Sequence, residues 1–130
     1  MAEEQHSTVY SSPGVKLDEG KDRFELIPPE PLFALAKLYT DGATKYGDRN
    51  WEKGMSYMRL FGALCRHAFK WARGESWDVD PKTGAITHHM IQVMWCAAGI
   101  YALSARPSTQ SYDDRPFVFA PPPGAPEEIV

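Results

Sequence analysis

The chain has 130 residues and a formal net charge of −3, so it has room for one domain and lacks the excess positive charge typical of duplex nucleic-acid binding. Apolar residues make up 43% of it, which is typical of a globular protein. No apolar run is long enough to span a membrane, and the acidic N-terminus does not resemble a signal peptide. We therefore expect a cytoplasmic protein with neither duplex nucleic acid nor a membrane as its partner.

Three helical patterns predict an all-α fold, a small bundle of three main helices with extended arms at both ends. The first helix is expected over residues 29–45, with prolines at its start and Gly47 at its end. The second is expected over residues 57–73, with Ser56 as its N-cap. The third, over residues 85–104, is apolar nearly all round, which predicts a central buried helix.

Composition changes at both ends of the chain and predicts three segments. We expect a flexible N-terminal arm (residues 1–22), a helical domain (residues 23–105) and a Pro-rich C-terminal arm (residues 106–130). The C-terminal arm could wrap a neighbouring subunit or remain without fixed structure. Because three helices of this length bury little apolar surface by themselves, we expect a homo-oligomer.

Two cysteines, Cys65 and Cys96, lie inside apolar helical patterns. They are expected to be small core residues in a reducing compartment. The chain has no CxxC pair, so its cysteines do not indicate a structural zinc site.

The segment from residue 45 to residue 54 concentrates charged and aromatic side chains between the first two helices. Its aromatic rings could stack on a base and its cations could meet phosphates, or the segment could be an ordinary solvated loop. The second helix carries further cations on one face, which fits either a polyphosphate cradle or a solvated basic surface. The candidate nucleotide-binding residues are Lys45, Tyr46, Arg49, Asn50, Trp51, Arg66 and Lys70.

The segment after the second helix carries three carboxylates, Glu75, Asp78 and Asp80, within six positions. Oxygen ligands at that density suit Mg²⁺ or Mn²⁺, although an acidic turn in water has the same composition. His89, near the start of the third helix, could complete a metal or acid–base site or could form a local hydrogen bond. His67 lies towards the apolar stripe of the second helix and, taken alone, reads as a core histidine.

An ordered series of short motifs runs over about residues 14–103. It comprises GKDRFELIPPE at 20–30, GATKYGDRNWEKG at 42–54, RH at 66–67, RGE at 73–75, DPKTG at 80–84, and His89. The series resembles a phage-associated domain described as dATP/dGTP diphosphohydrolase, N-terminal. The resemblance implies an α-helical domain from a phage or prophage that binds or acts on purine nucleotides with a divalent metal.

Two features depart from what that resemblance leads us to expect. The family's label is related to MazG-like pyrophosphohydrolases, whose paired ExxE and ExxD carboxylate motifs are absent from this chain. In addition, Gln92 stands three residues after His89, where a second histidine is expected. Both departures leave a binding function open beside hydrolysis.

Three hypotheses follow. The first is a metal-dependent dATP/dGTP diphosphohydrolase that releases pyrophosphate from a purine nucleotide. The alternatives are a non-hydrolysing sponge that sequesters nucleotide immune signals of the host, of the cyclic-dinucleotide type, and a helical interaction module. For the enzyme, the predicted catalytic residues are His67, Glu75, Asp80 and His89, and Mg²⁺ or Mn²⁺ is expected on Glu52, Glu75 and Asp80.

Overall fold

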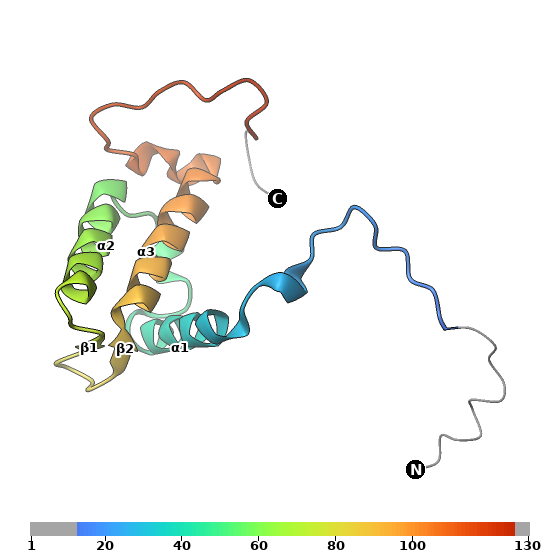
Figure 1. Cartoon of the computed structure of the whole chain (residues 1–130). Coiled ribbons are helices and arrows are strands. Elements are labelled where there is room, and N and C mark those ends of the chain that lie inside the picture. The colour runs from blue at the N-terminus through green and yellow to red at the C-terminus, as the bar shows by residue number, and fades with distance from the viewer. Residues whose placement is uncertain (1–12, 127–130) are drawn as a thin grey trace, which may run out of the picture.

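The computed structural model describes residues 13–126, and three main helices dominate it (Figure 1). The outer parts of the two expected arms, residues 1–12 and 127–130, lie outside the described residues. In chain order the elements are a 3₁₀ turn η2 (Phe24–Leu26), α1 (Pro29–Tyr46), η3 (Asn50–Lys53), α2 (Tyr57–Ala72), β1 (Trp77–Val79), β2 (Ile86–His88), α3 (His89–Ser104) and η4 (Pro107–Tyr112).

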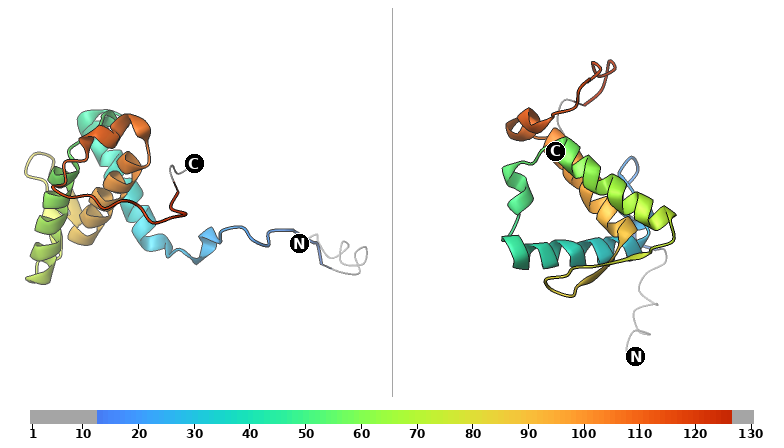
Figure 2. Two further views of the ribbon diagram at one scale, coloured as in Figure 1. Left: turned by 90° about the horizontal axis from the view of Figure 1, so that it is seen from above. Right: turned by 90° about the vertical axis from the view of Figure 1, so that its left-hand side faces the viewer.

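Helix α3 is the element against which the others pack. It contacts α2 along its length, and it also contacts α1, β2 and η4. Helix α1 runs across the end of the α2–α3 pair that carries the hairpin, and η4 lies at the opposite end of α3 (Figures 1 and 2). The segment before α1 runs away from the helices (Figure 1). These contacts confirm that the third helix is central, but its expected burial holds only in part, because Tyr101 and other residues of α3 are exposed.

The core is small and lies between α2, α3 and η4. Tyr57, Leu60 and Leu103 are buried together, and the rings of Trp51 and Trp95 pack against them. Both cysteines are free; Cys96 is buried, as expected of a core residue, whereas Cys65 is half-buried. Within the described range, no helix combines the length and the apolar character needed to cross a membrane.

The all-α prediction needs one correction between α2 and α3, where the chain forms an antiparallel hairpin. Strands β1 and β2 pair with Asp78 opposite Thr87, and α3 therefore begins at His89 and not at residue 85. The β-branched residues Val79, Ile86 and Thr87 favour extended backbone, and Gly84 takes a positive φ of 75° in the connecting turn. Apolar character alone could not separate this strand from the helix that follows it.

Polar side chains and glycines fix the helix ends much as the sequence indicates. Ser56 accepts a hydrogen bond from the Arg59 amide at 3.2 Å, so its role as the N-cap of α2 is confirmed. Asp114 adds a second acceptor, for the Met58 amide at 2.9 Å. Gly47, with φ of 92°, is the C-cap of α1, as expected. The helix includes Tyr46 and is therefore one residue longer at this end than predicted.

Gly54 provides a test of how the loop before α2 is held. Its φ is +106°, and a Cβ atom there would overlap the ring of Tyr112. We expect Gly54→Ala to lower the free energy of unfolding by about 2–4 kcal/mol, because both the backbone and the neighbouring ring oppose the added methyl group. Denaturant unfolding followed by circular dichroism measures the change.

The matched control is Gly42→Ala, in the interior of α1, where nothing lies within 4 Å of the added Cβ. This change should raise the unfolding free energy by about 0.5–1 kcal/mol, because alanine favours the helix. Equal unfolding midpoints for Gly54→Ala and the parent protein would contradict the packing described here.

Candidate functional site

An open hollow of about 1170 Å³ lies between α1, the loop that follows it, and the hairpin. Residues 37–51 form one side of it, and side chains of the hairpin and of α3, among them Thr87, Gln92 and Trp95, form the other. Pockets for drug-sized ligands typically measure about 300–1,000 Å³, so a nucleotide fits within this space.

Five of the seven predicted nucleotide-binding residues line this hollow, namely Lys45, Tyr46, Arg49, Asn50 and Trp51. They come together because Gly47 ends α1 and the chain then turns through η3. Arg49 itself has a left-handed backbone, with φ of 53°. The structure thus gathers the residues of this stretch on one wall of a single hollow.

The other two predicted residues, Arg66 and Lys70, do not line the hollow. They are exposed on α2, and their positive charges contribute to holding the pKa of His67 below its ordinary value. Their electrostatic influence therefore falls on the histidine cluster described below. Sequence reasoning placed them on the same helical face but could not say which site that face would adjoin.

An ion pair engages Lys45 in the wall of the hollow. The Lys45 ammonium lies 2.8 Å from Asp80 and 5.2 Å from the Tyr46 ring centroid. The hydrogen bond between Lys45 and Asp80 raises the pKa of Lys45 and lowers the pKa of Asp80. Asp80 also accepts a hydrogen bond from the Lys82 amide at 2.8 Å, so this carboxylate ties the hairpin turn to α1.

Trp51 is half-buried, and the guanidinium of Arg106 lies 4.9 Å from its ring centroid. The same Arg106 pairs with Glu52 at 2.9 Å. A cation over the indole is a favourable contact, and the Trp51 ring also packs against the buried core.

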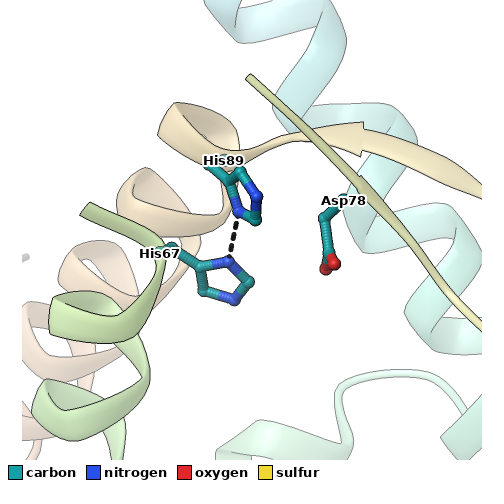
Figure 3. A group of neighbouring side chains, drawn as sticks. All are labelled: His67, Asp78 and His89. Carbon is teal, nitrogen blue, oxygen red and sulfur yellow. Dashed lines mark hydrogen bonds between the residues drawn. The ribbon is translucent and has the colours of Figure 1, made fainter. Parts of the chain in front are cut away.

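Next to the hollow, His67, His89 and Glu75 are joined by hydrogen bonds, and Figure 3 shows the two histidines. His89, the first residue of α3, has no exposed surface, and its Nε2 lies 2.7 Å from a carboxylate oxygen of Glu75. Its Nδ1 lies 2.8 Å from Nδ1 of His67, on α2. Because a carboxylate accepts hydrogen bonds, Nε2 of His89 donates to Glu75, and in a neutral ring Nδ1 then accepts from His67.

The surroundings of His67 and Glu75 determine the protonation states of these two side chains. Burial is the main cause that lowers the pKa of His67, which favours a neutral imidazole. The hydrogen bond from His89 lowers the pKa of Glu75, which favours the ionised carboxylate. A neutral imidazole can accept a proton or coordinate a metal ion.

Asp78 approaches the same two imidazoles from β1 (Figure 3). One donor atom each from His67, Asp78 and His89 lies within 4.8 Å of the others, so these three residues could hold a metal ion. Asp78 pairs across the hairpin with Thr87, which lines the hollow. Cross-strand partners share one face of a sheet, so the histidine cluster adjoins the hollow.

The predicted metal set of Glu52, Glu75 and Asp80 does not converge on one point. Glu52 pairs with Arg106 at 2.9 Å, Glu75 with His89 at 2.7 Å, and Asp80 with Lys45 at 2.8 Å. The predicted catalytic residues His67, Glu75 and His89 do lie together, whereas Asp80 lies at the hairpin turn. The chemical roles of all these residues remain predictions.

Asp78 is the residue that sequence reasoning noted as a carboxylate but did not select. The available signal was the alternation in the stretch Trp77–Asp80, because residues two apart in a strand share a face. That signal was weak, since the stretch was expected to be an irregular loop.

The depressed pKa of His67 predicts how stability changes with pH. The unfolded chain binds a proton at this imidazole near pH 6.5, above the pKa of the folded state. The contribution of the neutral His67 imidazole to the free energy of unfolding is therefore complete above pH 6.5. It is lost as the pH falls through 6.5 towards the pKa of the folded state. As the pH is lowered from 8 to 5.5, the denaturant midpoint of unfolding should fall in the parent protein. It should fall less steeply in His67→Gln.

A proton NMR titration of the same imidazole is the direct measurement. A His67 pKa above 6.5, or equal pH slopes in the parent protein and the variant, would contradict the assignment. The pKa of Glu75 is also lowered, but its contribution is lost only at more acidic pH, below its ordinary value of 4.5.

Comparison with known proteins gives two matches. The sequence model of a family described as "dATP/dGTP diphosphohydrolase, N-terminal" matches residues 11–115. The "dATP/dGTP diphosphohydrolase" of Salmonella phage PMBT28 is 33% identical over 113 residues, which cover 84% of this chain and 35% of the relative. The chain thus spans about a third of the length of that relative. No solved structure matches significantly.

Proposed function

We propose that this chain, which belongs to the dATP/dGTP diphosphohydrolase, N-terminal family, binds a purine deoxynucleoside triphosphate and hydrolyses it to the monophosphate and pyrophosphate with a divalent metal ion. The observation that carries the proposal is the hollow lined by Lys45, Arg49 and Trp51, with the histidine cluster at its edge. The name of the phage relative supports a purine substrate.

The side chains of the hollow have separate tasks in binding. The exposed ring of Tyr46 offers a flat surface to a purine base, and the half-buried Trp51 lines the same hollow. Arg49 and Lys45 offer cations to the phosphates, and Arg49 has a planar guanidinium that can hold two phosphate oxygens at once. Phosphate binding by Lys45 would compete with its ion pair to Asp80.

Hydrolysis adds one water to the nucleotide. The water oxygen forms a bond to the α-phosphorus and the water gives up a proton to solvent, the bond from that phosphorus to the bridging oxygen breaks, and the β- and γ-phosphates leave as pyrophosphate. A divalent ion supplies Lewis-acid stabilisation of the phosphate charge that develops. The cations lining the hollow contribute electrostatic stabilisation to the leaving pyrophosphate.

One observation favours the binding-only alternative. Glu52 and Asp80, two of the three residues predicted to hold the metal ion, are already engaged with Arg106 and Lys45. A sponge for nucleotide signals needs cations and aromatic rings but no free carboxylates for a metal. The same hollow would then hold its ligand without changing it.

Arg49 provides a test of binding. We expect Arg49→Gln to weaken dGTP binding about 10- to 100-fold, because a hydrogen bond to a charged group contributes about 1.5–3 kcal/mol. Isothermal titration calorimetry measures the affinity. The matched control is Arg59→Gln, an exposed arginine of α2 that does not line the hollow, and it should bind as the parent protein does.

The reaction is tested on the same preparations by chromatography of the nucleotide after incubation. dGMP and pyrophosphate should appear with divalent metal and should not appear with EDTA. Recovery of intact dGTP under both conditions would reject hydrolysis and leave the binding-only alternative. Equal affinities of Arg49→Gln and Arg59→Gln would reject the hollow as the nucleotide site.

We also propose that the chain forms a homo-oligomer through the outer face of α2. Met58, Phe61 and Phe69 are exposed there, at helical spacings of three and eight residues. A second apolar stripe on a helix that already packs against α3 is unusual for an isolated monomer. An isologous dimer, in which two copies of α2 meet, would cover it.

Light scattering after size exclusion tests the assembly. We expect a mass above one chain for the parent protein and a shift towards one chain for Phe69→Lys. Leu26→Lys, at an exposed apolar position away from α2, should leave the mass unchanged. A monomeric parent protein would reject the proposal.

A further inference from the structure

We propose that His67, Asp78 and His89 (Figure 3) bind one divalent transition-metal ion of the class of Mn²⁺, Fe²⁺, Co²⁺ or Zn²⁺, and that Glu75 orients His89 for this task. This assignment deepens the proposed function, which requires a divalent ion without saying where it binds. Its basis is the geometry of the four side chains, so it can be tested without a nucleotide.

The first argument is the spacing of the donor atoms. Metal–nitrogen and metal–oxygen distances of about 2.0–2.2 Å place neighbouring ligand atoms roughly 3 Å apart. The two Nδ1 atoms lie 2.8 Å apart, and all three donors lie within 4.8 Å. An ion therefore needs only a small movement of Asp78 and a change of the His67 tautomer, in which the ring proton moves from Nδ1 to Nε2.

The second argument is the position of Glu75. Its side chain is 56% exposed, yet it reaches back to Nε2 of a histidine that is fully buried. A carboxylate that accepts the outer N–H of a ligating histidine fixes the ring and directs its other nitrogen towards the metal. The observed hydrogen bond does this for Nδ1 of His89.

The third argument is charge. Asp78 and Glu75 together carry two negative charges, which balance those of a divalent ion. The cations Arg66 and Lys70 act on His67 from the exposed side of α2. Three protein ligands leave coordination positions of the ion open. An anionic ligand such as a phosphate would occupy one of them, and the two cations would offset its negative charge.

The donor types select the class of metal. Two imidazoles and one carboxylate suit Mn, Fe, Co or Zn, whereas Mg²⁺ prefers oxygen ligands and retains several waters. This differs from the expected oxygen set of Glu52, Glu75 and Asp80, whose members pair with three different groups. The two histidines are thus assigned as ligands in place of the proton-transfer role expected for them.

The test measures Co²⁺ and Mg²⁺ binding to the full chain in the absence of nucleotide, by calorimetry and by the visible absorption of bound Co²⁺. We expect one Co²⁺ per chain, bound at least about 100-fold more tightly than Mg²⁺. Asp78→Asn and His67→Asn should each weaken Co²⁺ binding about 100-fold or more. Glu75→Gln should weaken it about 10- to 100-fold and shift the Co²⁺ spectrum, which a purely structural role would not do.

The matched controls are Asp80→Asn and Glu52→Gln, carboxylates of the same region that lie outside the group. They should bind Co²⁺ as the parent protein does. Near-UV circular dichroism checks the fold of each variant. Because Asp78 lies on the hairpin and is not fully buried, Asp78→Asn keeps the test decisive should His67→Asn unfold.

Unchanged Co²⁺ affinity in Asp78→Asn would overturn the assignment, and so would the absence of one-to-one binding or a preference for Mg²⁺. Failure of this proposal and failure of hydrolysis are separable. Tight Co²⁺ binding without dGTP turnover would reject only the reaction, whereas turnover that survives in Asp78→Asn would reject only the metal site.

Discussion

The packing of α2 against α3 is the constraint on which the rest of the structure depends. Leu60 and Leu103 are buried between the two helices, and Leu60 also lies beside Gly99 of α3. The same alignment brings His67 on α2 opposite His89 on α3 at the hairpin end. One helix contact therefore supplies both the core and the frame of the histidine cluster.

The hollow and the histidine cluster depend on different parts of the fold. The hollow requires α1 to cross the helix pair, so that residues 45–51 face the hairpin and α3. The ion pair between Lys45 and Asp80 joins those two walls. Its partly exposed position indicates a modest contribution to stability, so a phosphate that draws Lys45 away would cost little.

The sequence predicts the three helices, the caps Ser56 and Gly47 and the gathering of residues 45–51, because periodicity and these capping residues are local signals. It does not predict the hairpin, because strands of three residues carry too little alternation to be distinguished from a loop. Because the hairpin is not predicted, Asp78 is not among the predicted site residues. The pairing of Glu75 with His89 was equally out of reach, because it depends on how the hairpin turns the chain back between α2 and α3.

The four polar side chains of the cluster, from His67 to His89, lie within one continuous stretch of 23 positions that runs from the second half of α2 through the hairpin to the start of α3. Its contacts are short in sequence, so little chain entropy opposes its closure during folding. The stretch from His67 to His89 could therefore be grafted as one segment onto another helical hairpin of matching geometry. The strand register is the part that such a graft has to preserve, since a slip of one position would turn the Asp78 carboxylate to the opposite side of the ribbon.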